Sequence, residues 1–300
     1  MGNLAIDIGG TKIALARVAG DRVEGRCQVA TPRSGRGEDI VAAIVAAAGD
    51  IPAQGAVGVA TTGIVDGGRL TALNPVTLPI EDGFALVDAL EQGLGRPVIA
   101  INDAQAAAWA EHRHGAGQGH ASMAFVTVST GVGGGIVLDG RLQTGARGLA
   151  GHVGHMAHDP NGPVCGCGRR GCIERIASGT AIASLGSEAL GRAMTAPEVF
   201  AAAEGGGADA SAVIEGAATA LASMFADLAA AVDVDAIVVG GGVGLAEGFL
   251  ARIVAAQSSI PAIFRRPLLR ARLGADAGLV GAGLLAAENN LHPSTSAENV

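Results

Sequence analysis

The chain has 300 residues, of which 49% are hydrophobic and 16% are charged, and its formal net charge at pH 7 is −8. This length allows two domains of ordinary size, while the acidic balance and the 2% of aromatic residues argue against a nucleic-acid surface of basic patches and stacked rings. No apolar stretch reaches the roughly 18–20 uncharged residues of a membrane span, and the first residues carry no basic and apolar leader. We therefore expect a globular, cytoplasmic protein that binds neither nucleic acid nor membrane.

The predicted elements, in chain order, begin with a hairpin in which two β-rich runs bracket the turn "DIGGTK". A second hairpin, with the turn "STGVGGG", repeats this plan about 120 residues later, and the remaining strands alternate with helices. This order predicts α/β architecture with two related lobes. The expected elements are a hairpin over 4–20, a helix over 37–50, strands over 55–65 and 96–103, a helix over 103–115, a hairpin over 123–140, a helix over 209–232, a strand over 234–242 and a helix over 276–288.

Three glycine-rich turns are candidates for phosphate binding, since backbone amides approach phosphate oxygens closely where no side chain intervenes. The first follows Asp7, whose carboxylate could hold Mg²⁺ through water, and it contains Lys12, the single lysine among 20 Lys and Arg residues. The others are "STGVGGG" and "VVGGGVG". Each could also be an ordinary turn, and none has Walker A or Rossmann spacing.

Asn102 and Asp103 end one predicted strand and begin a helix. Open α/β sheets bind their ligands at this edge, so Asp103 is a candidate catalytic base. Helix capping, which Asn and Asp perform routinely, is the alternative for this pair.

The stretch "GHVGHMAHDPNGPVCGCGRRGCIE" (151–174) holds three of the four cysteines and three of the seven histidines. Three thiolates and one imidazole form a common structural zinc site, whereas a redox site is disfavoured because no CxxC is present. Spacing alone does not choose the fourth ligand among His152, His155 and His158. Cys27 stands apart and is expected to be an ordinary core or strand residue.

These four motifs, "DIGGTK", "NDAQAAAWAE", "STGVGGG" and the histidine–cysteine block, occur in the order found in the ROK family of sugar kinases and repressors, which the chain resembles over residues 3–288. The resemblance implies the actin-like ATPase fold, in which two lobes of duplicated RNase H-like topology flank a central cleft, and a homodimer. The implied N-terminal lobe is 1–103, joined by a returning C-terminal helix at about 276–290. The larger C-terminal lobe is 104–275, with a zinc-binding loop at 151–174. We expect a disordered tail at 291–300.

The resemblance also implies the site residues. Asp103 would be the catalytic base for the sugar's 6-hydroxyl, and ATP would bind with Mg²⁺. A structural zinc would brace the sugar pocket. The implied nucleotide-binding residues are Asp7, Gly9, Gly10, Thr11, Lys12, Thr130, Gly131, Gly133, Gly134, Gly240, Gly241, Gly242 and Val243; the implied sugar-binding residues are Gly63, Asn102, Asp103, His152, His155 and Glu174; the implied zinc ligands are His155, Cys165, Cys167 and Cys172.

One departure from the family pattern bears on the substrate. Many of its sugar kinases, glucokinases among them, have "GExGH" where this chain has "GHVGH", so His152 replaces a glutamate that contacts the sugar. Bacterial family members that phosphorylate N-acetylmannosamine resemble the chain here, so the resemblance implies an N-acetylated amino sugar. Another hexose or N-acetylhexosamine kinase is the alternative. A sugar-sensing repressor is disfavoured because the chain begins on its first predicted phosphate strand, without a helix-turn-helix.

Overall fold

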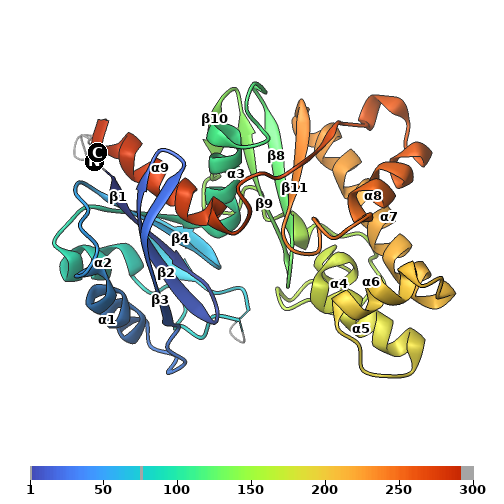
Figure 1. Ribbon diagram of the computed structural model, residues 1–300, viewed down its shortest axis with the longest axis horizontal. Coiled ribbons are helices and arrows are strands. Elements are labelled where there is room, and N and C mark those ends of the chain that lie inside the picture. Colours follow the sequence, from blue (N-terminus) through green and yellow to red (C-terminus); the bar gives the residue numbers. More distant parts are fainter. Residues whose placement is uncertain (1, 75–76, 292–300) are drawn as a thin grey trace. The chain divides into compact units, whose positions relative to one another are not determined.

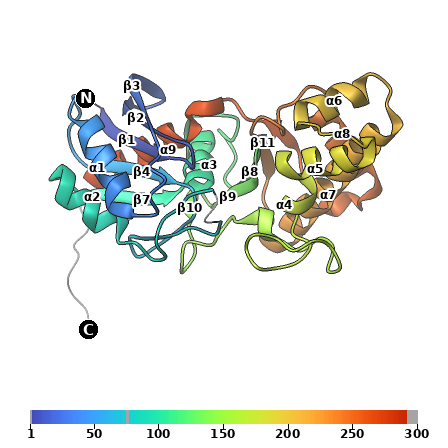
Figure 2. The same ribbon diagram turned by 90° about the horizontal axis from the view of Figure 1, so that it is seen from below.

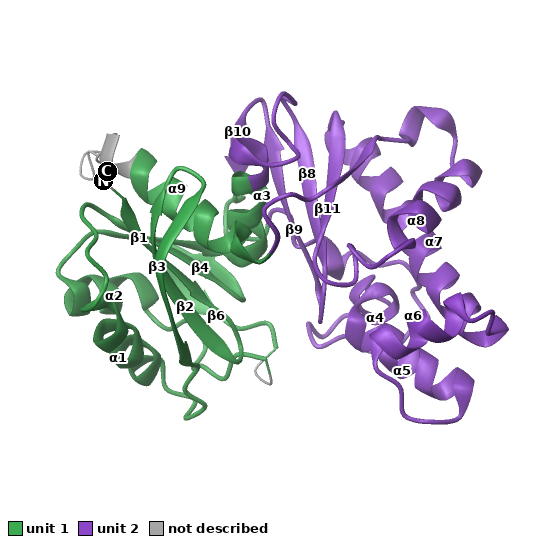
Figure 3. Ribbon diagram, in the orientation of Figure 1, with its two compact units in different colours: residues 1–110, 144–149, 275–300 green, residues 111–143, 150–274 purple. Residues whose placement is uncertain are grey.

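The computed structural model describes residues 2–74 and 77–291, and the chain divides into two compact units (Figure 3). Unit 1 comprises residues 1–110, 144–149 and 275–300, and unit 2 comprises residues 111–143 and 150–274. The expected division after residue 103 differs from this one, because the first turns of the helix that follows pack within unit 1. The C-terminal helix belongs to unit 1 together with the N-terminal segment.

Unit 1 is built on a five-stranded sheet in the order β3-β2-β1-β4-β7 (Figures 1 and 2). The first three strands of the chain pair antiparallel, and β1, β4 and β7 run parallel. Its elements are β1 (Asn3–Ile8), β2 (Lys12–Ala19), β3 (Arg22–Ala30), α1 (Gly37–Ala48), β4 (Val57–Thr61), β5 (Ile64–Asp66), β6 (Arg69–Thr71), α2 (Leu86–Leu94), β7 (Val98–Asn102), α3 (Asp103–His114, which ends in unit 2) and α9 (Ala277–Leu291).

Alternation along β1 divides this sheet into two covered faces. Its leucine and isoleucines join a buried cluster with Ile40 and Ile44 of α1, whereas Asp7 lies on the face that α9 covers, beside Gly278. Figures 1 and 2 show α1 and α2 on one side of the sheet and α9 on the other. Helix α9 lies unusually close to its neighbours: a Cβ on Gly58 would come within 1.9 Å of the Ala282 carbonyl oxygen, and one on Gly281 within 1.9 Å of that of Ala106.

Unit 2 repeats the same strand order, β10-β9-β8-β11-β12, with the same pattern of antiparallel and parallel pairs. The predicted duplication is thus confirmed at the level of topology. The elements are β8 (Met123–Val128), β9 (Val132–Leu138), β10 (Arg141–Gln143), η1 (Val153–His155), α4 (Glu174–Ala177), α5 (Gly179–Leu190), α6 (Ala196–Glu204), α7 (Ala208–Val232), β11 (Ala236–Gly240), α8 (Phe249–Ala256), η2 (Gln257–Ser259), η3 (Ala262–Phe264), β12 (Leu268–Arg270) and η4 (Gly274–Asp276, which ends in unit 1).

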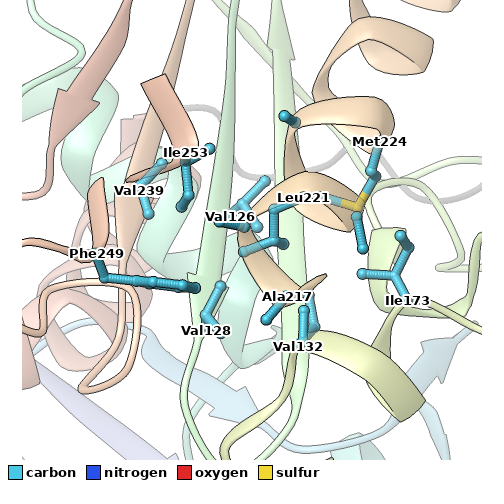
Figure 4. Close-up of a cluster of buried hydrophobic side chains, with 14 of the residues drawn as sticks. Val126, Val128, Val132, Ile173, Ala217, Leu221, Met224, Val239, Phe249 and Ile253 are labelled. Carbon is cyan, nitrogen blue, oxygen red and sulfur yellow. The ribbon is translucent and has the colours of Figure 1, made fainter. Parts of the chain in front are cut away.

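Helix α7 packs on the unit 2 sheet and forms the centre of its core. Figure 4 shows Leu221 and Met224 of this helix with Val126 of β8, and Phe249 and Ile253 of α8 beside them. By length and composition alone α7 could cross a membrane, but 56% of its apolar window is buried inside the structure. Its apolar character is therefore explained by the protein core that it fills.

The structure differs from the sequence-based expectations in several places. Helices and strands that were not expected include α2, α5, α6, α8, β6, β10 and β12. The strand expected over 55–65 is two strands, β4 and β5, interrupted at Thr62 and Gly63, because Gly63 has a φ of +110°. Strand β3 was not predicted, since its largely exposed and charged residues give no apolar run. The tail expected at 291–300 begins one residue too early, as Leu291 ends α9, and its remainder lies outside the described residues.

Candidate active site and metal centre

Asp103 begins helix α3 directly after β7, and its carboxylate is half-buried. Its Oδ1 accepts a hydrogen bond from the Ala104 amide at 2.8 Å, and its Oδ2 accepts one from the Thr62 hydroxyl at 3.1 Å. Burial raises the pKa of Asp103, and these hydrogen bonds partly lower it. The result is an oriented carboxylate that is a stronger base than an exposed aspartate.

Asn102, the neighbouring candidate, caps helix α3. Its side-chain oxygen accepts hydrogen bonds from the amides of Ala104 at 2.9 Å and Gln105 at 3.3 Å. Its amide nitrogen donates to the Gly63 carbonyl at 2.9 Å. Asn102 therefore fixes the start of α3 and the Gly63 loop together, so the capping role is present, and a direct contact with sugar stays a prediction. A Cβ on Gly63 would lie 2.7 Å from the Thr71 carbonyl oxygen, which explains the glycine.

Asp7 lies half-buried near the end of β1, in the same unit. Burial, and then the charge of Asp103, raise the pKa of Asp7 from 3.8 to about 6, although Arg26 and Lys12 oppose this. Two carboxylates that influence each other in this way would be stabilised by a divalent cation.

The turn after Asp7 is closed by a hydrogen bond from the Gly9 amide to the Lys12 carbonyl at 3.0 Å. A Cβ on Gly10 would lie 2.3 Å from the Thr77 carbonyl oxygen, so only glycine fits there. Thr11 and Lys12 are exposed at the tip of the turn. The geometry leaves a compact loop whose side chains do not obstruct its amides.

In unit 2 the second and third glycine turns meet at the carboxyl ends of β8 and β11. The Val128 carbonyl accepts hydrogen bonds from the amides of Val243 and Gly244, each at 3.0 Å. The Thr130 carbonyl accepts one from the Thr180 hydroxyl at 2.9 Å, in the first turn of α5. Gly241 has a φ of +82°. The two turns and a helix N-terminus thus gather at the sheet edge where α/β folds bind ligands.

Two residues of the second motif lie inside the sheet. Gly133 and Gly134 belong to β9 and pair with Thr127 and Val126. A Cβ on Gly134 would lie 2.9 Å from the Gly151 carbonyl oxygen. Strand packing is sufficient to require that glycine, and a nucleotide contact at either position stays a prediction.

Glu174 connects the histidine–cysteine loop to this second turn. Its Oε2 accepts a hydrogen bond from the Val132 amide at 3.2 Å, and its Oε1 lies 3.9 Å from Sγ of Cys165. A Cβ on Gly131 would come within 2.6 Å of Oε2. The glycine therefore makes room for the carboxylate.

His155, Cys165, Cys167 and Cys172 form a cluster whose ligand atoms all lie within 4.8 Å of one another. The Sγ atoms of Cys167 and Cys172 are 3.7 Å apart, as are Sγ of Cys165 and Nδ1 of His155. Tetrahedral zinc with Zn–S bonds of about 2.3 Å separates its sulfur ligands by roughly 3.8 Å. The donor set and spacing therefore fit a structural zinc site.

Without a nearby cation, the three thiols of the cluster do not all ionise at neutral pH. Burial, together with the neighbouring sulfurs of Cys167 and Cys165, raises the pKa of Cys172 to about 12. Three thiolates this close repel one another unless a metal ion neutralises them.

The three histidines that spacing left open differ in their positions. His155 alone among them contributes a ring nitrogen to the cluster. His158 is exposed, and His152 precedes η1 with both ring nitrogens buried.

A sequence model of the ROK family matches residues 3–289, nearly the whole chain. The chain belongs to the ROK family. It is similar to the N-acetylmannosamine kinase of Yersinia pestis (strain Pestoides F), with 49% identity over 286 residues that cover 94% of this chain and 97% of that protein. The N-acetylmannosamine kinase of Yersinia pseudotuberculosis serotype O:1b is equally similar.

Solved ROK structures resemble the chain throughout. The ROK hexokinase of Thermus thermophilus is 38% identical with a TM-score of 0.86, covering 96% of this chain and 99% of its own. The ROK glucokinase of Streptomyces griseus, solved with glucose and AMPPNP, is 36% identical with a TM-score of 0.80, covering 96% and 100%. With the repeated strand order of the two units, this confirms the predicted actin-like ATPase fold.

Sequence reasoning missed the residues that orient this ROK protein's candidate groups. Thr62, which donates to Asp103, has a weak signal, a hydroxyl residue just after a buried strand. The Val132 amide that donates to Glu174 has none, because any residue supplies an amide.

Proposed function

We propose that this ROK protein is an ATP-dependent kinase that transfers the γ-phosphoryl group of ATP to the 6-hydroxyl of N-acetylmannosamine. The observation that carries the proposal is the carboxylate of Asp103, half-buried at the start of α3 and oriented by Thr62 and the Ala104 amide. The 49% identity to kinases named for this sugar supports the substrate.

In the proposed reaction the sugar's 6-oxygen attacks the γ-phosphorus while Asp103 accepts the hydroxyl proton. The new O–P bond forms as the bond to the bridging oxygen of ADP breaks, and ADP leaves. The burial that raises the pKa of Asp103 favours this proton transfer. Mg²⁺, bound with ATP, would neutralise phosphate charge, and Asp7 is the residue proposed to hold it through water.

We assign the remaining groups unit by unit, taking the two units as the two lobes of the kinase. In unit 1, the amides of residues 10–12 would contact phosphates, since the Gly9 amide donates to the Lys12 carbonyl. Asn102 and Gly63 would shape the sugar pocket. In unit 2, Thr130 and the adjoining turn would contact phosphates, and residues 240–243 would support the adenosine. Glu174 and the ring of His155 would contact sugar hydroxyls.

A structural zinc is proposed at His155, Cys165, Cys167 and Cys172. When bound, it would neutralise the thiolates and lock the loop over 151–174. His155 would bind it through Nδ1, the atom nearest Cys165. The metal would therefore hold sugar-binding residues in position without taking part in the transfer.

A hexokinase or glucokinase activity is the second candidate, favoured by the 38% and 36% identities to such ROK enzymes. His152 supports the N-acetylated sugar, because a ring nitrogen can donate or accept where a carboxylate only accepts. We also propose that the enzyme is cytoplasmic and a homodimer, the latter from the family resemblance alone.

A coupled assay that follows ADP release tests the proposal with N-acetylmannosamine, N-acetylglucosamine, glucose and fructose. We expect the highest kcat/KM with N-acetylmannosamine. A higher kcat/KM with glucose would reject the substrate and leave the kinase. If none of these sugars leads to ADP release, the proposed function is rejected.

A further inference from the structure

The segment Thr31–Arg33, just after β3, binds three successive carbonyl groups of the "DIGGTK" turn. The buried Thr31 hydroxyl donates to the Gly9 carbonyl at 2.7 Å, and the Thr31 amide donates to the Thr11 carbonyl at 3.1 Å. Nη1 of Arg33 donates to the Gly10 carbonyl at 3.0 Å. One short segment therefore binds the carbonyl oxygens of residues 9–11.

The direction of these carbonyls fixes the direction of the amides that follow them. In a planar trans peptide the C=O and the next N–H point in opposite directions. Because the carbonyls of Gly9, Gly10 and Thr11 face the segment, the amides of Gly10, Thr11 and Lys12 face away from it. Consecutive amides turned to one side form the kind of nest that binds anions.

Arg33 makes a second contact that encloses the turn. The same Nη1 lies 3.2 Å from the Thr77 carbonyl oxygen, the atom that leaves no space for a side chain on Gly10. Arg33 thus links the turn to the loop packed against it. It also places a permanent positive charge beside the turn, which attracts phosphate oxygens.

We infer that Thr31 and Arg33 are positioning residues for ATP: they hold the "DIGGTK" turn in its phosphate-binding conformation before the nucleotide arrives. The inference rests on the proposed function and deepens it. Donors fixed in advance bind an anion without losing conformational freedom on binding. Loss of either residue should therefore weaken recognition of the phosphates while leaving the sugar site unchanged.

The experiment compares Thr31→Val, Thr31→Ser and Arg33→Met with the unmodified chain, with Arg36→Met as a matched control. Arg36 is an exposed arginine of the same loop, and its Nε lies 3.8 Å from a carboxylate oxygen of Glu38. Titration calorimetry measures binding of ATP and AMP without sugar, and steady-state kinetics measure KM for both substrates. Circular dichroism checks that each variant is folded.

Loss of one such hydrogen bond should raise Kd and KM for ATP about three- to tenfold in Thr31→Val and Arg33→Met. Binding of AMP, which lacks the β- and γ-phosphates, and KM for the sugar should stay unchanged. Thr31→Ser, which keeps the hydroxyl, should bind ATP as the unmodified chain does, and so should Arg36→Met.

Unchanged ATP affinity in Thr31→Val and Arg33→Met would overturn the inference while the proposed function stands. Equal loss in Thr31→Ser, which keeps the hydroxyl, and in Thr31→Val would also overturn it, since keeping the hydroxyl would then not preserve ATP binding. Failure of the unmodified chain to bind ATP would instead overturn the proposed function, and the inference with it.

Discussion

Replacing Asp103 with asparagine separates the chemistry of the proposed base from its structural role. Asparagine has nearly the same shape, its Oδ1 can still accept the Ala104 amide, and the Thr62 hydroxyl can rotate to accept from the new amide group. The substitution keeps these hydrogen bonds and removes a buried carboxylate whose pKa is raised, so the free energy of unfolding at pH 7.5 should stay the same or rise. The asparagine cannot take a proton, and loss of a general base typically lowers kcat by about 10²–10⁴-fold.

The same substitution has an electrostatic effect that does not depend on activity. The charge of Asp103 contributes, after burial, to raising the pKa of Asp7 to about 6. In Asp103→Asn that repulsion is removed, so the pKa of Asp7 should fall below 6 while burial keeps it above 3.8. Carboxyl-carbon NMR titration measures this shift, and Asp66→Asn, an exposed aspartate in the same unit, serves as the control.

Rates and binding for this variant complete the test. The coupled assay should show kcat reduced at least a hundredfold, with sugar affinity by calorimetry changed little. An Asp103→Asn enzyme that retains near-normal turnover would refute the assignment of Asp103 as the base. An unmoved Asp7 titration would refute the electrostatic pairing of the two carboxylates.

Three further predictions concern the metal, the pH dependence and the sugar. The purified chain should contain one zinc ion, and finding no zinc by elemental analysis would contradict the site. The Cys167→Ser variant should lose the zinc, melt at a lower temperature and bind sugar more weakly, with a smaller effect on ATP binding. The control Cys27→Ser, in β3, should show none of these changes. Burial raises the pKa of Asp7 in the folded chain from 3.8 to about 6. The contribution of Asp7 to the free energy of unfolding is therefore most favourable below about pH 4, where the carboxyl is protonated, and it is lost as the pH rises through about 6. Asp7→Asn should therefore stabilise the unliganded chain at pH 7.5 by about 1–3 kcal/mol and by less at pH 5. Thermal unfolding at the two pH values measures this difference, and equal stabilisation at pH 7.5 and pH 5 would contradict the prediction. His152→Glu should shift kcat/KM towards glucose by roughly tenfold, since each mismatched polar contact costs about 1–3 kcal/mol, and an unchanged preference would exclude His152 from sugar selection.

The local pattern of the sequence was enough to predict much of this protein. Apolar runs around glycine turns identified both hairpins, and an Asn–Asp pair after a strand identified the start of α3, because strand alternation and turn chemistry depend on nearby residues. The cysteine spacing restricted the metal centre to one loop. The family motifs supplied the fold.

Contacts between distant residues were decided only by the tertiary structure. Spacing could not choose His155 over His152 and His158, because all three lie within a few residues and only the folded loop turns one ring towards the sulfurs. Thr31 and Arg33 follow a largely exposed strand with no apolar run, yet they bind carbonyl groups of a turn 22 and 23 residues earlier in the chain. Gly58 and Gly281 cannot be told from ordinary flexible glycines in the sequence. Their lack of a side chain matters because α9 lies against β4 and α3 in the folded chain. Such contacts depend on which surfaces pack together in the folded chain, and this packing cannot be inferred from residues that are neighbours in the sequence.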